Sequence, residues 1–242
     1  MGFAVIDSHC HILAGFDDGA VNTDISVIMA HLAASDGTKT IIATPHIRDC
    51  SLKPEIIEKA TQVLNVWLKR LNIPVNVIPG AEVSLLLDPE SMTDYTINNT
   101  PYILIEIPHT HLPDHFKEIV FQLKINGYRP IIAHPERHPN IIKQPELLLD
   151  LHDSDIGVQI TADSLTGRFG KDIQRCAEYL LQKNAVDIIA SDAHSSVDRL
   201  PGLSKGLRIA AGIVGMEKAM NLVTTNPEAI INGESFPCST YA

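Results

Sequence analysis

Seven short apolar runs recur along the chain, each separated from the next by a longer segment. They are rich in Ile and Val and do not alternate with polar residues, which is typical of parallel strands buried on both faces. The predicted strands are residues 4–7, 40–44, 75–79, 102–107, 130–133, 157–160 and 186–190.

The segments between these runs carry helical periodicity. Apolar residues from 25 to 33 recur at the i, i+3, i+4, i+7 and i+8 positions of one helix face. This helix is predicted to begin at Thr23 or Asp24, which are good capping residues, and to stop at Gly37. Further helices are predicted at about 54–71, 114–126, 171–182, 203–213 and 227–231. Strands alternating with helices indicate an α/β domain, either a parallel barrel or a doubly wound sheet.

Ionisable residues decide between these two folds, because six of the seven predicted strands deliver a His, Asp or Glu at the carboxyl end. These residues are His9, His11, His46, Glu82, Glu106, His134, Asp192 and His194. In a barrel such ends converge on one face, where active sites are built, whereas an open sheet spreads them along an edge. We therefore favour a TIM-like barrel of seven strands.

Composition narrows the classes of function. The chain has 242 residues, of which 45% are hydrophobic, and no linker or low-complexity tract divides it. We expect a single domain over residues 1–242. There are 19 Lys and Arg against 29 Asp and Glu, a formal net charge of −10. This acidic balance argues against nonspecific binding of nucleic acid, which depends on cations that neutralise phosphates.

Targeting signals and cysteine usage indicate a cytoplasmic setting. No apolar stretch approaches the roughly 20 residues of a membrane span, and the first residues turn polar too early for a signal peptide. Cys10, Cys50, Cys176 and Cys238 form no CxxC pair and are too sparse for a disulfide scaffold.

His9-Cys10-His11 is a His-x-His pair at a predicted strand end. Residues two apart on a strand point to the same face, so both imidazoles can reach one metal ion while Cys10 points away. We expect Asp7 to hold an imidazole N–H of this pair from behind.

The other candidate ligands indicate which metals suit the site. Asp192 and His194 repeat the i, i+2 spacing after the last strand. Imidazole and carboxylate without thiolate suit Zn, Mn or Fe. A carboxylate such as Glu82 can bridge two ions, and bridged ions generate a nucleophilic hydroxide near neutral pH.

Several motifs together resemble the PHP (polymerase and histidinol phosphatase) superfamily, and most closely its bacterial protein-tyrosine phosphatases encoded with capsular or exopolysaccharide genes. The matching stretches are DSHCHILAGFDDGA, ATPH, PGAE, LIEI, AHPER and SDAH, with Arg199 beyond the last, and they span residues 5 to 199. The resemblance implies a distorted barrel of the PHP type.

The same resemblance implies a trinuclear metal centre. The three ions would be held by His9, His11, Glu82 and Asp192; by Glu82, Glu106 and His134; and by Asp18, His46 and His194. Asp18 matches the family position because it directly precedes a glycine, and Asp17 is interpreted as a turn residue only. Arg137 and Arg199 match catalytic residues that bind phosphate oxygens. Four carboxylates against three divalent ions leave about +2, which attracts a phosphoester dianion.

The activity that the resemblance implies is hydrolysis of phosphotyrosine in a protein. The implied substrate is the tyrosine-rich tail of a kinase in a polysaccharide-export system, and Mn is the expected metal, with Fe or Zn as alternatives. Two other functions stay open: a small-molecule phosphatase (for histidinol phosphate, for example) or phosphodiesterase on the same centre, and an inactive, metal-stabilised binding subunit.

A histidine-rich loop after Glu106 matches no motif of the family. His109, His111 and His115 can line the substrate entrance, and their spacing does not favour a second metal site. Cys10 and Cys50 lie near the proposed centre, but no phosphate-cradling loop ending in Arg marks either as a nucleophile.

Overall fold

The computed structural model describes residues 4–152 and 156–236, and its strands form two parallel sheets. The three-stranded sheet has the order β1-β2-β4, and the six-stranded sheet has the order β3-β5-β6-β7-β8-β9. The strands are β1 (Val5–Cys10), β2 (Thr38–Ala43), β3 (His46–Ile47), β4 (Asn76–Pro79), β5 (Glu82–Ser84), β6 (Tyr102–Glu106), β7 (Arg129–Ala133), β8 (Gly157–Thr161) and β9 (Ile188–Ala190).

Each of the seven predicted runs overlaps a strand, and the two unpredicted strands continue earlier ones after a short break. β3 follows β2 across Thr44 and Pro45, and β5 follows β4 across Gly80 and Ala81. Pro45 cannot donate a ladder hydrogen bond, although its carbonyl accepts the Glu82 amide at 3.0 Å. The predicted strands 40–44 and 75–79 stop before β3 and β5, and the structure pairs its strands as two parallel sheets.

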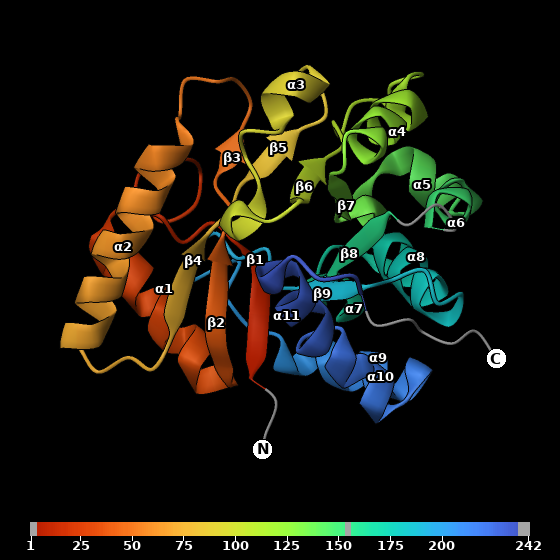
Figure 1. Ribbon diagram of the computed structural model, residues 1–242. Coiled ribbons are helices and arrows are strands. Elements are labelled where there is room, and N and C mark those ends of the chain that lie inside the picture. The colour runs from red at the N-terminus through yellow and green to blue at the C-terminus, as the bar shows by residue number, and fades with distance from the viewer. Residues whose placement is uncertain (1–3, 153–155, 237–242) are drawn as a thin grey trace.

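The six predicted helices are all present and lie around the outside of the strands (Figure 1). They are α1 (Thr23–Asp36), α2 (Pro54–Arg70), α4 (Phe116–Ile125), α8 (Lys171–Gln182), α9 (Ser204–Val214) and α11 (Thr225–Asn232). The periodicity did not predict α3 (Pro89–Met92), α5 (Pro139–Lys143), α6 (Glu146–His152), α7 (Ala162–Leu165), α10 (Met216–Asn221) or the 3-10 turns Ile97–Asn99 and Pro135–Arg137, most of which are too short to carry it.

The ends of α1 test the capping prediction. Gly37 ends the helix in the left-handed conformation, with φ 106°, as expected. The N-cap is Asn22, one residue before the predicted Thr23 or Asp24, and its side chain accepts the Ile25 amide. The helix thus starts where an amide side chain, and not a hydroxyl or carboxylate, satisfies its first N–H groups.

The backbone also joins β1 to the segment that follows β9. The Asp192 amide donates to the His9 carbonyl at 2.8 Å, and the His11 amide donates to the Ala193 carbonyl at 2.9 Å. A parallel bridge pairs Cys10 with Ala193. The first and last strands therefore lie side by side, although about 180 residues separate them.

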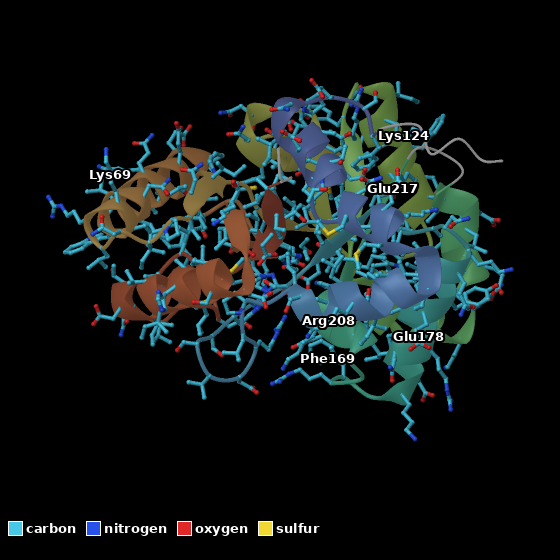
Figure 2. All side chains as sticks on the ribbon, turned by 90° about the horizontal axis from the view of Figure 1, so that it is seen from below. Lys69, Lys124, Phe169, Glu178, Arg208 and Glu217 are labelled. Atoms are coloured by element: carbon cyan, nitrogen blue, oxygen red, sulfur yellow. The ribbon has the colours of Figure 1, made fainter. Side chains whose placement is uncertain are left out.

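Apolar packing supports the carboxyl ends of the strands from below. A cluster of buried residues between the sheets includes Ile6, Ile42, Leu104 and Ile188. Leu104 and Glu106 are two apart on β6, so they share one face of the strand. Side chains fill the space between helices and strands, and charged residues such as Lys69 on α2 lie at the periphery (Figure 2).

None of the helices in the described ranges combines the length and the apolar composition that a membrane-spanning helix needs. Cys10, Cys50 and Cys176 are free thiols, and Cys238 lies outside the described residues.

Candidate metal centre

The fold brings all nine predicted ligands to one site. Four groups of ligand atoms form there, in each of which the atoms lie within 4.8 Å of one another. The groups are His11, Asp18, His46 and His194; His9, His134 and Asp192; His9, His11 and Glu82; and His46, Glu82 and Glu106.

The deepest group contains the His-x-His pair on β1. The Nε2 atoms of His9 and His11 face each other at 3.0 Å, and both rings are buried. Oε2 of Glu82 lies 3.3 and 3.4 Å from these two nitrogens, and Oδ1 of Asp192 lies 3.5 and 3.4 Å from them. Two imidazoles and two carboxylates thus converge on one point, as the ligand set implied for the first ion requires.

Glu82 connects this set of ligand atoms to a second set. While its Oε2 faces the pair on β1, its Oε1 lies 2.7 Å from Nε2 of His134. Nδ1 of His46 lies 2.9 Å from Glu82 Oε2 and 3.4 Å from Glu106 Oε2. Oε2 of Glu82 thus faces imidazoles of two groups and Oε1 faces His134, so this carboxylate is placed to bridge two ions. His134 and Glu106, implied as ligands of one ion, fall in separate groups here.

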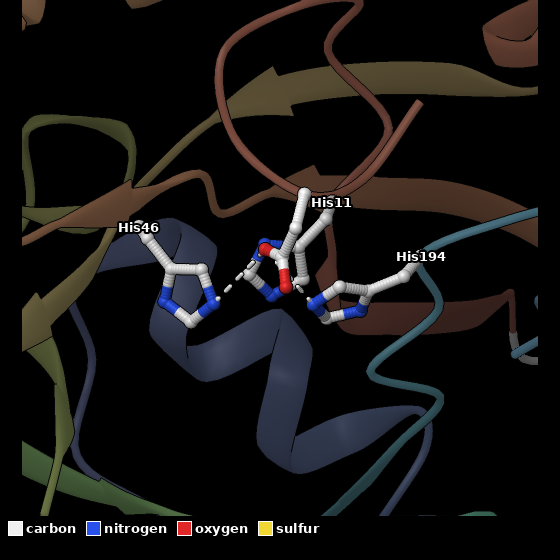
Figure 3. Close-up of side chains that lie close together, drawn as sticks. His11, His46 and His194 are labelled. Atoms are coloured by element: carbon white, nitrogen blue, oxygen red, sulfur yellow. Dashed lines mark ion pairs between the residues drawn. The ribbon is translucent and has the colours of Figure 1, made fainter. Parts of the chain in front are cut away.

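A third group is more open to solvent (Figure 3). Oδ1 of Asp18 lies 3.5 Å from Nε2 of His46 and 3.7 Å from Nε2 of His194. The ring centroid of His11 lies 3.8 Å from that of His194, so His11 joins this group as well as the deep one. Asp18 is 63% exposed, and the site therefore has one accessible side.

Hydrogen bonds behind the imidazoles fix their orientation. Nδ1 of His9 lies 2.8 Å from Oε1 of Gln159, and Nδ1 of His11 lies 2.7 Å from Oδ2 of Asp17. Because these oxygens can only accept, Nδ1 carries the proton and the Nε2 lone pair is directed into the site. Buried nitrogen lone pairs and carboxylate oxygens aimed at common points fit divalent cations well.

Two predictions about aspartates near this site are wrong. Asp17, interpreted as a turn residue only, does accept the Gly19 amide, but it also accepts from His11 Nδ1 and from the His46 amide. Asp7, expected to hold an imidazole, accepts instead from the amide and hydroxyl of Ser191. Asp17 therefore does for His11 what was expected of Asp7.

Gln159, which orients His9, was not among the predicted residues. A polar residue inside the otherwise apolar run of β8 was a signal, since a buried amide must find a hydrogen-bond partner. Glu136 was missed too: it is fully buried and accepts from the Thr161 amide and the Ser164 hydroxyl. Glu136, which directly precedes Arg137, thus connects the segment after β7 to the end of β8.

The two predicted arginines meet at Asp192. Guanidinium nitrogens of Arg137 and Arg199 both contact Oδ2 of Asp192, and Arg199 also donates to the Asp192 carbonyl. Arg137 donates to the Thr161 hydroxyl, and its guanidinium lies over the ring of Phe169. The Nε atoms of both arginines are buried without a hydrogen-bond partner. Two cationic forks beside the ligand groups can bind a tetrahedral anion.

Charge pairing dominates the protonation of the site. Burial raises the pKa of the Asp192 carboxyl, but Arg137 and His9 outweigh it and hold the pKa well below its usual range. Burial lowers the pKa of His46, but the carboxylates of Glu106 and Glu82 raise it to about 9. Burial and the neighbouring His11 lower the pKa of His194 to about 3. The Asp192 carboxylate is thus kept ionised, as a metal ligand must be.

Backbone strain accompanies this arrangement. His134 and Asp192 have φ values of 34° and 51°, in the left-handed region that non-glycine residues rarely adopt. Such strain persists where the surroundings determine the conformation, and it occurs often at functional sites.

His111, His115, His138 and Cys10 belong to none of the ligand-atom groups in the described part of the chain. His138 is buried and caps α5 by accepting the Asn140 amide, and its Nε2 lies 3.1 Å from the Pro108 carbonyl. His111 and His115 are exposed. Cys10 points into the apolar core, where burial raises the pKa of its thiol well above the usual value, so it is inert as a nucleophile.

Known proteins share this fold and these motifs. The model of the family "Capsular polysaccharide synthesis, CpsB/CapC" matches residues 5–232. The tyrosine-protein phosphatase YwqE of Bacillus subtilis is 35% identical over 96% of this chain and 93% of its own. The tyrosine-protein phosphatase CpsB of Streptococcus pneumoniae is 29% identical over 94% of this chain and 98% of its own.

A solved structure agrees with these relatives. A chain from the crystal structures of YwqE and CpsB, described as unique metal-dependent tyrosine phosphatases, superposes with a TM-score of 0.91 and 35% identity over 96% of each chain. The resemblance noted in the sequence is confirmed, and the chain belongs to the CpsB/CapC family of capsular polysaccharide synthesis proteins.

Proposed function

We propose that this protein is a metal-dependent phosphatase that hydrolyses phosphotyrosine in a protein substrate. The observation that carries the proposal is the convergence of nine imidazole and carboxylate side chains beside two arginines at one rim. The names of the relatives, tyrosine-protein phosphatases, support the same activity.

We propose that the nine residues hold three divalent ions, with Mn²⁺ as the expected metal and Fe or Zn as alternatives. His9, His11 and Asp192 would hold one ion, Glu82 would bridge it to another held with Glu106 and His134, and Asp18, His46 and His194 would hold the third. Bound ions of this kind neutralise phosphoryl charge and activate water for attack on phosphorus.

The chain's own residues would bind and orient the substrate. Arg137 and Arg199 present guanidinium forks that can hold the equatorial phosphoryl oxygens. Thr161 and Phe169 already fix Arg137, which lowers the cost of ordering it on binding. The departing phenolate, with a pKa of about 10, needs less protonation than an alkoxide.

The proposal extends to the fold and the setting. The strands form a distorted (β/α)7 barrel in which β2 with β3, and β4 with β5, each count as one broken strand and β9 returns to β1. The pairing order and the bonds between His9 and Asp192 support this closure. We further propose that the chain folds as one domain, acts in the cytoplasm and takes the tyrosine-rich tail of a capsule-export kinase as substrate.

The test compares substrates on protein purified without added ions. Metal content is measured by mass spectrometry, and kcat/KM is then measured with Mn²⁺ on a phosphotyrosyl peptide, histidinol phosphate and a phosphodiester. We expect the peptide to be preferred and a chelator to abolish turnover. Preference for histidinol phosphate or the diester would favour the small-molecule reading.

Replacing His46 or Asp192 with Ala separates an enzyme from a binding subunit. Both variants should lose hydrolysis if the centre is catalytic. Metal retention and binding of a kinase tail without turnover in the wild type would instead identify an inactive binding subunit.

A further inference from the structure

The loop between β6 and α4 holds a histidine that the ligand groups leave unused. Nε2 of His109 lies 3.7 Å from Oε1 of Glu106, yet His109 belongs to none of the ligand-atom groups found among the described residues. Its side chain is 58% exposed. His109 therefore lies at the rim of the site and faces solvent.

Three imidazoles form a column from the core to this rim. The ring of His9 stacks on that of His134 with centroids 5.6 Å apart, and His134 stacks on His109 at 5.9 Å with only 11° between the ring planes. His9 is fully buried and His134 nearly so. One face of the His109 ring is thus covered by His134, and the exposed remainder is open to an incoming molecule.

The phosphate-binding side of the site lies close by. Arg137 follows His134 in the same short turn: its amide donates to the His134 carbonyl at 3.1 Å, and His109 stacks on the His134 ring. The ring of Phe169, on the loop before α8 (Figure 2), packs over the Arg137 guanidinium, with its centroid 4.3 Å from Cζ of Arg137. Of these two rings, His109 has the more exposed side chain.

We propose that His109 is the aromatic wall that receives the phenyl ring of a phosphotyrosine, and that it makes the site prefer aryl over alkyl phosphates. This inference rests on the proposed function. In phosphotyrosine the rigid ring is one ester bond from phosphorus, so a phosphoryl group held by Arg137 places the ring at the rim. Aromatic pairs pack with centroids 4.5–7 Å apart, whereas a phosphoserine offers only a methylene there.

The test uses non-hydrolysable probes, so that it does not depend on turnover. Binding of phenylphosphonate, methylphosphonate and inorganic phosphate to metal-loaded protein is measured by calorimetry. His109→Ala removes the ring, His109→Gln keeps hydrogen bonding without a ring, and His109→Phe keeps a ring without an N–H. His111→Ala, in the same exposed loop, is the matched control.

We expect the preference for phenyl- over methylphosphonate to fall about three- to tenfold in the Ala and Gln variants and to persist in the Phe and His111→Ala variants. Metal content and phosphate affinity should stay unchanged in all four. The same loss of preference should appear in kcat/KM for a phosphotyrosyl against a phosphoseryl peptide.

Three results would overturn this role. The first is no preference for phenylphosphonate in the wild-type protein. The second is a preference kept by the Gln variant and lost by the Phe variant, which would indicate a hydrogen bond. The third is loss of metal from His109→Ala, which would make His109 a ligand. If the wild type prefers phenylphosphonate but does not hydrolyse phosphotyrosine, the proposed function is refuted. The role of His109 in receiving an aromatic ring would still hold.

Discussion

His9-Cys10-His11 and His109-Thr110-His111 have the same spacing but opposite surroundings. The first pair ends a buried strand, and its Nε2 atoms meet at 3.0 Å. The second lies in an exposed loop, where the His111 imidazole contacts the hydroxyl of its neighbour Thr110 and His109 reaches the rim. A strand directs alternate side chains to one face, and a loop does not. Spacing alone therefore identifies a metal pair only when a strand carries it.

Replacing both histidines of each pair with alanine should give the largest difference between the two regions. His9→Ala with His11→Ala is expected to lose bound metal and on the order of a thousandfold in kcat/KM, because cations supply several kcal/mol of transition-state stabilisation. His109→Ala with His111→Ala should keep the metal and lose no more than about tenfold. Metal analysis and kinetics on both double variants check this, and equal losses would contradict the comparison.

Substitutions at two glycines test how the loop after β1 places Asp18 beside His11. A Cβ on Gly19 would lie 2.1 Å from the His11 carbonyl oxygen, so Gly19→Ala must displace the loop that carries Asp17 and Asp18. We expect the free energy of unfolding to fall by about 3 kcal/mol. The variant should also lose the metal ion proposed to bind Asp18, His46 and His194.

Gly15 is the matched control for this substitution. It has φ 75° with nothing within 4 Å of an added Cβ, and Gly15→Ala should cost only about 1 kcal/mol of backbone strain. Denaturant unfolding of both variants measures the difference, and equal costs would show that the close approach at Gly19 is relieved elsewhere.

Asp17→Asn probes the support behind His11. The variant keeps the shape of the side chain but offers a weaker acceptor to Nδ1–H, so we expect a 10- to 100-fold loss in metal affinity or activity. Asp49→Asn, an exposed turn aspartate, is the control. An unchanged affinity in Asp17→Asn would mean that strand geometry alone orients His11.

The pH dependence of metal binding should report the proton that His46 carries without metal. Without metal, Glu106 and Glu82 raise the pKa of His46 to about 9, so its imidazole is protonated at pH 7. A cation must displace this proton, and apparent affinity should therefore rise up to about tenfold per pH unit from 7 to 9. Chelator competition across this range measures the slope, and a flat profile would contradict the pairing.

Much of the ligand set was accessible from sequence because parallel strands end at one edge. The apolar runs locate those ends, and a His, Asp or Glu just beyond them is conspicuous. The helices around them follow from periodicity and from end signals such as Gly37. β3 and β5 were not accessible, since two or three residues that begin with His46 or Glu82 are too short to form an apolar run.

The supporting residues could not be predicted because they depend on distant partners. His9 and Gln159 are 150 positions apart, and only the packed strands bring them together. Asp7 precedes the pair and Asp17 follows it, and the direction of the loop after β1 decides which one reaches His11. The left-handed backbones of His134 and Asp192 likewise follow from the assembled site.

The bond between the Asp192 amide and the His9 carbonyl has a consequence for biosynthesis. Translation at about 5–20 residues per second needs roughly 10 to 40 seconds to travel from the first strand to the last. During that time the nascent polypeptide displays His9 and His11 without the carboxylate that completes their group. Metal acquisition is thus tied to the end of synthesis, and a ribosome that stalls before β9 releases a product unable to assemble the deep group.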